Sequence, residues 1–163
     1  MITDQIPRNR HNLMFANHAP LLTSDYLNHF GELVMLLEML PDMPEAIDDA
    51  RAWRPRSYQS HLGAMTWSST AQLRMDFERL EPHRREMLDE ASANANRLGS
   101  AIVAALQDDR LSPERLSGVV HLGCGAMHAH IRRLSAILAG LSDIDVEMPS
   151  CDAQAQIDAV LAA

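Results

Sequence analysis

Histidine and cysteine side chains recur in one stretch of the sequence at a spacing that places them on one face of a helix. His121, Cys124 and His128 are three and four residues apart, the spacing of successive helical turns. Imidazole and thiolate groups bind zinc, nickel, copper and iron. Because His121 and His128 would lie about 10 Å apart along the helix, one ion also needs ligands from a second helix. His29 and Glu32, one turn apart near the N-terminus, are the candidates, and the cofactor would be a transition metal such as zinc.

The common metal motifs of helical proteins are missing from the sequence. There is no Glu-x-x-His, His-Glu-x-x-His or His-x-x-x-His, which argues against a di-iron bundle and against the zinc-hydrolase helix. The outline of a small bundle with histidines on a late helix resembles the DinB-like metal-binding family in architecture alone. The alternative interpretation is that these histidines lie at the edge of the core, each hydrogen-bonded to a neighbour. Whether the protein is an enzyme stays open.

The segment His121-Leu122-Gly123-Cys124-Gly125-Ala126 resembles the histidine-phosphotransfer motif. That resemblance implies that His121 carries a phosphoryl group and that Gly125 leaves room for a docking partner. Cys124 stands where the motif has a lysine that assists the phosphoryl group. Phosphotransfer through His121 is therefore a third functional hypothesis.

Small residues form a second stripe on the same predicted helix. They are Gly118, Gly125, Ala129, Ala136 and Gly140. A glycine inside a helix costs about 1 kcal/mol relative to alanine, so a stripe of this kind indicates close approach of another backbone. That backbone belongs either to the same bundle or to a second copy of the chain, which would make the protein a homodimer.

Three arginines gather between two predicted helices, next to Trp53 and Tyr58. They are Arg51, Arg54 and Arg56. Guanidinium groups pair with carboxylates or phosphates, so an anion-binding site is one hypothesis. The other is pairing within the chain, with the acids that precede them: Asp42, Glu45, Asp48 and Asp49.

The rest of the sequence predicts an all-α protein, because Ala, Leu, Met, Glu and Arg are frequent and no alternating strand pattern occurs. Asp42 and Glu45 have the spacing of a capping box, and Ser112 precedes Pro113 at a second helix start. The expected helices span 24–40, 42–53, 82–107 and 113–141, with a further helix that ends at Leu80 and is capped by Ser68, Ser69 or Thr70. Residues 57–65 form a short segment, and a short helix follows Pro149. On the 82–107 helix the apolar residues form one buried stripe.

These elements predict a single-domain bundle of four to five main helices over 23–141. Residues 1–22 would form an irregular N-terminal arm, and residues 142–163 an acidic C-terminal extension with a short helix. The 14 basic residues are all arginine and the acids number 22, a net charge of −8. This balance argues against binding to nucleic acid or to an anionic membrane.

The leading functional hypothesis is binding to a protein partner, as a cytoplasmic regulatory or adaptor module that forms a homodimer. The two cysteines form no CxxC pair, and neither a secretory signal nor an apolar run of membrane-spanning length is present. The alternative is a metal-binding bundle, with or without enzyme activity, that uses the late-helix histidines.

Overall fold

The computed structural model of the chain describes residues 19–66, 70–108, 110–140 and 152–162, and every regular element in these ranges is a helix. The predicted all-α fold class is therefore confirmed. The helices of this described part are α1 (Ala19–Met39), α2 (Ala46–Ala52), α3 (Tyr58–Ala64), α4 (Thr70–Glu78), α5 (Pro82–Leu106), α6 (Pro113–Ala139) and α7 (Asp152–Ala162).

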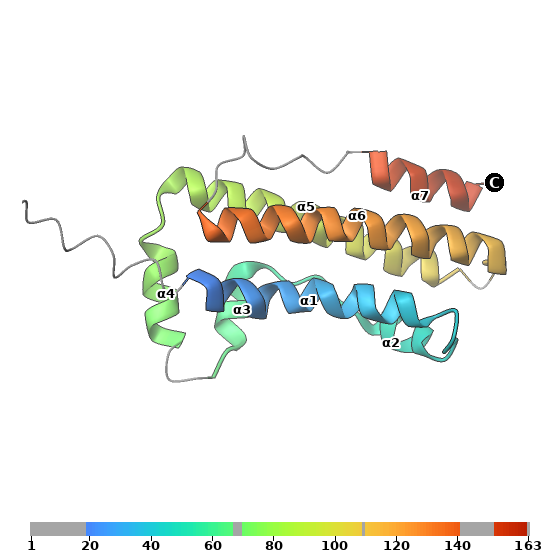
Figure 1. Cartoon of the computed structure of the whole chain (residues 1–163), viewed down its shortest axis with the longest axis horizontal. Helices are drawn as coiled ribbons and strands as arrows, with labels where there is room; N and C mark the ends of the chain where they lie inside the picture. The colour runs from blue at the N-terminus through green and yellow to red at the C-terminus, as the bar shows by residue number, and fades with distance from the viewer. Residues whose placement is uncertain (1–18, 67–69, 109, 141–151, 163) are drawn as a thin grey trace, which may run out of the picture.

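Three long helices form the body of the molecule. Figure 1 shows α1 and α5 running in one direction along the longest axis, with α6 running in the opposite direction beside them. The shorter α7 packs on α5 and α6, while α2 packs on α1 and α5. α4 crosses one end of the bundle and packs against α3. The packing of α1 and α5 on α6 decides which side of α6 is buried, and it leaves His121 and His128 exposed.

The core draws side chains from all the long helices and from α7. Its largest fully buried side chains are Tyr26, Tyr58, Phe30, Leu33, Leu37, Leu88, Ile102, Leu106, Met127, Leu134, Ile157 and Val119. The stripe predicted on the 82–107 helix is buried throughout: Met87, Leu88, Ala91, Ala95, Leu98, Ile102, Ala105 and Leu106. Burying each large apolar side chain contributes about 1.5–3 kcal/mol, so this interior supplies most of the favourable free energy of folding.

Two helix starts differ from the predictions. α1 begins at Ala19 rather than Ser24, inside the segment expected to be irregular. Pro20 lies in its first turn, where the missing N–H has no helical partner. The predicted capping box is wrong: α2 begins at Ala46, and Glu45 makes no side-chain cap bond. The backbone N–H of Asp42 bonds instead to the carbonyl of Met39, because the chain is still turning out of α1 there.

Two other helix starts are capped by serine hydroxyls. Ser57 accepts from the backbone N–H of Ser60 and begins α3, and Ser112 accepts from that of Arg115 at 3.3 Å and begins α6. Some predictions fall outside the described residues: positions 1–18 of the N-terminal arm, and positions 142–151 of the acidic extension with Cys151.

Candidate functional site

α6 carries most of the residues that the sequence singles out, and both of its ends are well defined. Its C-terminus is capped by Gly140 in the left-handed conformation at φ 85°. Arg84 reinforces that end by donating from Nη2 to the carbonyl of Ile137 at 3.1 Å. A cation near the last carbonyls of a helix is favourable, because those carbonyls have no partners along the helix.

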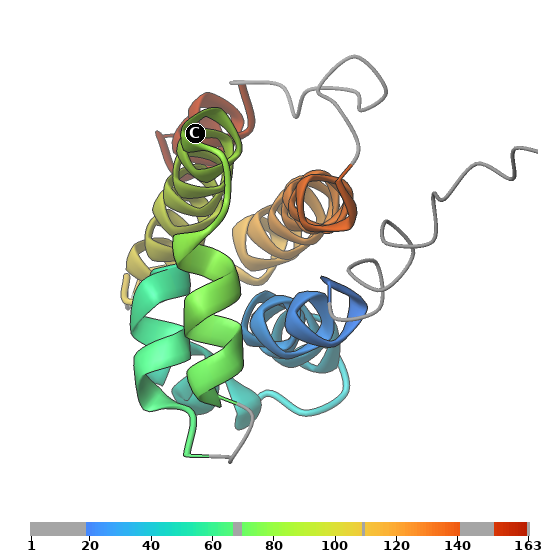
Figure 2. The ribbon, with the colours of Figure 1, turned by 90° about the vertical axis from the view of Figure 1, so that its left-hand side faces the viewer.

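One side of α6 is buried and the opposite side is exposed. Gly123 lies on the buried side, where an added Cβ would come within 3.0 Å of Cδ1 of Ile102. We define the outer face of α6 as the exposed residues Glu114, His121, Gly125, His128 and Arg132, together with the half-buried Gly118. The six positions are separated by four, three, four, three and four residues, so they form one straight seam along the helix. In Figure 2, α6 is flanked by α1 on one side and by α5 and α7 on the other, and no described helix lies over its outer side.

Gly125, near the middle of this seam, has no packing role within the described part of the chain. A Cβ added there would meet no atom within 4 Å. The other members of the predicted small-residue stripe divide into two groups. Gly118 and Ala129 are half-buried, whereas Ala136 is buried and Gly140 is the C-cap of the helix. Ala136 and Gly140 are therefore explained by the fold of a single chain.

The structure does not bring the predicted metal ligands together. Cys124 is buried, and burial followed by the charge of Glu38 raises the pKa of its thiol to about 11. The raised pKa makes the thiolate, which is the form that ligates a metal, harder to form at this position. Glu32 is exposed on α1, and His29 packs elsewhere. Among the described residues, no group of three or more His, Cys, Asp and Glu side chains is placed to hold a metal ion.

His29 belongs instead to an aromatic–histidine cluster, which we define as Tyr26, His29, Trp53, Tyr58 and His61. The rings of His29 and Trp53 stack with centroids 4.8 Å apart, and Nε1 of Trp53 donates to the backbone carbonyl of His29 at 3.0 Å. Burial, then the charges of Arg56 and His61, lower the pKa of His29 to about 4. This imidazole is neutral at physiological pH, and its Nε2 atom is buried without a hydrogen-bond partner.

His61 occupies the same environment and was not singled out by its sequence. Its ring lies 5.4 Å from that of Tyr26, and both of its nitrogens are buried without hydrogen-bond partners. Burial and the charge of Arg56 lower its pKa, and Asp25 opposes this shift. Burial also raises the pKa values of Tyr26 and Tyr58. The spacing of Tyr26 and His29, one turn apart, was the only available signal for the cluster.

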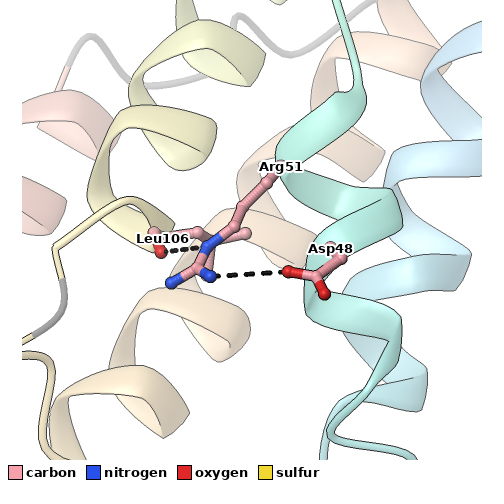
Figure 3. Close-up of polar contacts among 3 residues, drawn as sticks. All are labelled: Asp48, Arg51 and Leu106. Carbon is pink, nitrogen blue, oxygen red and sulfur yellow. Dashed lines mark hydrogen bonds and ion pairs between the residues drawn. The ribbon is translucent and has the colours of Figure 1, made fainter.

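The three predicted anion-binding arginines do not form one site. Arg51 donates from Nε to the carbonyl of Leu106 at 2.8 Å and pairs with Asp48 at 3.5 Å (Figure 3). Arg54 donates to the carbonyls of Arg51 and Trp53 at the end of α2. Of the three, only Arg56 has an exposed side chain with no hydrogen bond to a helix end, and its backbone is held by Tyr26 and Asn96.

The arginines share a structural task that sequence reasoning missed. Arg74 donates to the carbonyls of Leu62 and Gly63 at the end of α3. Arg85 donates to those of Phe77 and Glu78 at the end of α4. Together with Arg51, Arg54 and Arg84, these side chains donate hydrogen bonds to carbonyls at the C-terminal ends of α2 to α6. The planar fork of a guanidinium suits this role, and the complete absence of lysine was its signal in the sequence.

Searches against protein-family models, curated proteins and solved structures found no significant match. Within the described residues, no helix combines the length and the apolar character needed to cross a membrane. The outer face of α6 therefore stands as the candidate site on its own geometry.

Proposed function

We propose that the protein acts by binding, as a small regulatory or adaptor module, and that the outer face of α6 is its binding surface. The partner on this surface is a second copy of the chain. The proposal assigns no catalytic step to the outer face.

Gly125 is the observation that carries the proposal. Gly99 and Gly123 have side chains of neighbouring helices within 2.5 and 3.0 Å of an added Cβ, and Gly140 has a positive φ. Gly125 and Gly31 on α1 have neither reason, yet each costs about 1 kcal/mol in mid-helix relative to alanine. Gly125 differs from Gly31 in that it is exposed and lies in a seam with a second glycine, Gly118. Close approach of another backbone from outside the chain accounts for that cost.

Charge complementarity supports a second copy as the partner. Glu114 and Arg132 are the two fully charged residues of the outer face, and they lie at opposite ends of it. When two copies pack α6 on α6 in antiparallel orientation, each Glu114 lies opposite the Arg132 of the other copy. Such exposed pairs contribute about 0.2–1 kcal/mol each, and they select the antiparallel orientation over the parallel one.

Between the two charged pairs, the same register matches large residues with small ones. It places His121 opposite Gly125 of the second copy, and Gly118 opposite His128 of the second copy. Each imidazole thus faces a position without a side chain, which allows the two helices to approach closely. The spacing of four and three residues suits helices that cross at about 20°.

Sedimentation velocity of the full chain over a range of concentrations tests this proposal. The change is Gly125→Gln, which adds a polar side chain to the seam and is tolerated by the space around Gly125. We expect the wild-type chain to dimerise and the variant to do so at least about tenfold more weakly, a change of about 1.4 kcal/mol.

Gly63→Gln is the matched control, because Gly63 also has open space around it but lies on α3. It should dimerise as the wild type does. A wild-type chain that stays monomeric at its highest soluble concentration would refute the proposed partner. Equal dimerisation of the Gly125→Gln variant would refute the proposed surface.

One observation favours a second function, histidine phosphotransfer. His121 is exposed, as a phosphoryl-accepting imidazole must be, and Gly125 leaves open space one turn further along the helix. The buried thiol of Cys124 does not replace the assisting lysine of that motif, and Arg132 lies about 16 Å along the helix from His121. Phosphotransfer is therefore the weaker of the two proposals.

Phosphoramidate provides a direct test of this second function. It transfers its phosphoryl group to imidazole nitrogen with release of ammonia, and the product has a characteristic phosphorus NMR signal. Phosphotransfer requires a phosphohistidine that forms in the wild type and in His128→Gln but not in His121→Gln. Equal labelling of both variants would show that the reaction follows exposure alone.

A further inference from the structure

The register of the proposed dimer brings together histidines that one chain keeps apart. We propose that the dimer carries two equivalent sites for a zinc-class ion, each built from His121 of one copy and His128 of the other. This inference rests on the proposed function, because the sites do not exist in the monomer.

A single chain cannot supply the site from its own outer face. His121 and His128 are seven residues apart on α6, which separates them by about 10 Å along the axis. Nitrogen ligands of zinc lie about 2 Å from the ion, so the two rings cannot share one ion without a large distortion. The described part of the chain offers no alternative set of three or more ligands.

The antiparallel register removes this obstacle. His121 lies in the layer opposite Gly125 of the second copy, and His128 of that copy lies in the next layer, about 4.5 Å further along the axis. The helix axes in such pairs are about 8–10 Å apart, a separation that two histidine side chains span when they ligate one ion. The facing glycines leave room for the ion and its remaining water ligands.

Symmetry then produces two identical sites about 10 Å apart along the seam. All four imidazoles lie on the same flank of the seam, because the twofold axis exchanges the two copies without moving residues to the opposite flank. Neutral imidazole favours zinc, nickel and copper over magnesium and calcium, which prefer oxygen ligands. Two histidines per ion leave open positions for water, so the binding is reversible and zinc regulates the dimer.

Zinc and dimerisation are linked, because the ion binds the dimer and not the separated chains. Added zinc therefore strengthens dimerisation, and dimerisation strengthens zinc binding by the same factor. We expect the dimer dissociation constant to fall on the order of tenfold on going from chelator to zinc.

The test uses the tag-free full chain in sedimentation velocity, once with EDTA and once with zinc chloride, together with zinc titration by calorimetry. His121→Ala and His128→Ala should each remove the zinc effect, measured as the ratio of the dimer dissociation constants with EDTA and with zinc, so that any change in the EDTA-state dimer of each variant is accounted for. His83→Ala is the control, because His83 is an exposed histidine on α5, away from the outer face of α6. It should respond to zinc like the wild type.

Mixing the two single variants gives the decisive result. A heterodimer of His121→Ala with His128→Ala retains one complete site, made from the remaining His128 and His121 of the two copies. The mixture should therefore regain zinc-dependent strengthening and bind one ion per heterodimer, although neither variant does so alone. Ligation within one chain, or between copies in a parallel dimer, predicts no recovery on mixing.

The outcomes separate this inference from the proposed function. Zinc strengthening that is lost in each single variant and restored in their mixture supports the shared sites. A dimer that ignores zinc, or single variants that keep the full effect, overturns the sites but leaves the dimer proposal standing. A chain that stays monomeric with EDTA and with zinc overturns both.

Discussion

Two pairs of histidines in this protein lie in regions with opposite properties. In the aromatic–histidine cluster, the His29 ring stacks on Trp53 and the His61 ring packs beside Tyr26. On the outer face of α6, His121 and His128 are exposed. The first pair is half-buried against aromatic side chains of the core, and burial lowers the pKa of both imidazoles. The second pair is accessible to another molecule and contributes little to the fold.

Both regions hold a histidine followed three residues later by a second potential metal ligand, and the difference comes from what packs against each helix face. His29 and Glu32 are separated by three residues, as are His121 and Cys124. On α1 the histidine turns towards Trp53, whereas on α6 it is the cysteine that turns inwards and the histidine that remains outside. A pair of potential ligands at helical spacing becomes a site only where the surrounding fold leaves it uncovered.

The largest effect that separates the regions is expected for Trp53→Ala. This change removes a buried ring, its stacking on His29 and the Nε1 bond to the backbone of α1. The free energy of unfolding should fall by about 3–5 kcal/mol. Urea denaturation followed by circular dichroism measures it. Met35→Ala is the control, because Met35 is 52% exposed and should change stability by less than about 0.5 kcal/mol.

A smaller loss is expected for Gly99→Ala. The added Cβ would lie 2.5 Å from Cη2 of Trp53, so the indole ring has to shift in a packed core. Overpacking of this kind costs about 1–3 kcal/mol. Thermal and urea denaturation measure the loss, with Gly31→Ala as a control that has open space around it. If Gly99→Ala proved as stable as the wild type, the contact between α5 and Trp53 would not be tight.

The fold was largely predictable because α-helices leave local signals. Proline, serine caps and the period of apolar residues placed most helices within a few residues of their observed ends. The failures have tertiary causes. The Asp42 capping box did not form because the chain continues to turn after α1, and Ala19 extends α1 upstream because Pro20 is compatible with a first turn.

The candidate site was less predictable, because periodicity identifies faces of a helix but not which face is covered. The sequence picked out His121, His128 and Gly125, and it could not show that Gly125 has open space around it. It also placed His29 with the late histidines, since nothing in the sequence pairs His29 with Trp53, 24 residues later. The arginine caps depend on distances between helix ends, which no local pattern encodes.

The pH dependence of stability should distinguish the histidines of the two regions. The pKa of His29 is lowered by burial in the folded state from its ordinary value of 6.5 to about 4. The unfolded chain therefore binds more protons in this interval, and stability falls as the pH decreases from about 6.5 towards 4. His29→Phe keeps a ring against Trp53 and removes the titration, so it should reduce this dependence.

Urea midpoints at neutral pH and near pH 5 measure this effect as the difference between variant and wild type, because carboxylates titrate equally in both. His121→Gln is the matched change on the outer face of α6. It removes an exposed histidine, so a change in pH dependence that His29→Phe shows and His121→Gln lacks belongs to the His29 ring. An identical pH dependence in His29→Phe and the wild type would mean that the His29 ring is not buried in solution.

The smallest effect on stability is expected for Gly125→Ala, which should stabilise the monomer rather than destabilise it. Alanine at this position meets no neighbouring atom, so helix propensity alone should raise the stability of the monomer by up to about 1 kcal/mol. The added methyl group would occupy space opposite His121 of the second copy, which should keep the two helices further apart and weaken dimerisation. Denaturation at a concentration far below dimerisation, together with sedimentation velocity, measures the two effects separately. A variant that is more stable and also dimerises as well as the wild type would leave this glycine without a binding role, since folding alone would then favour alanine at that position.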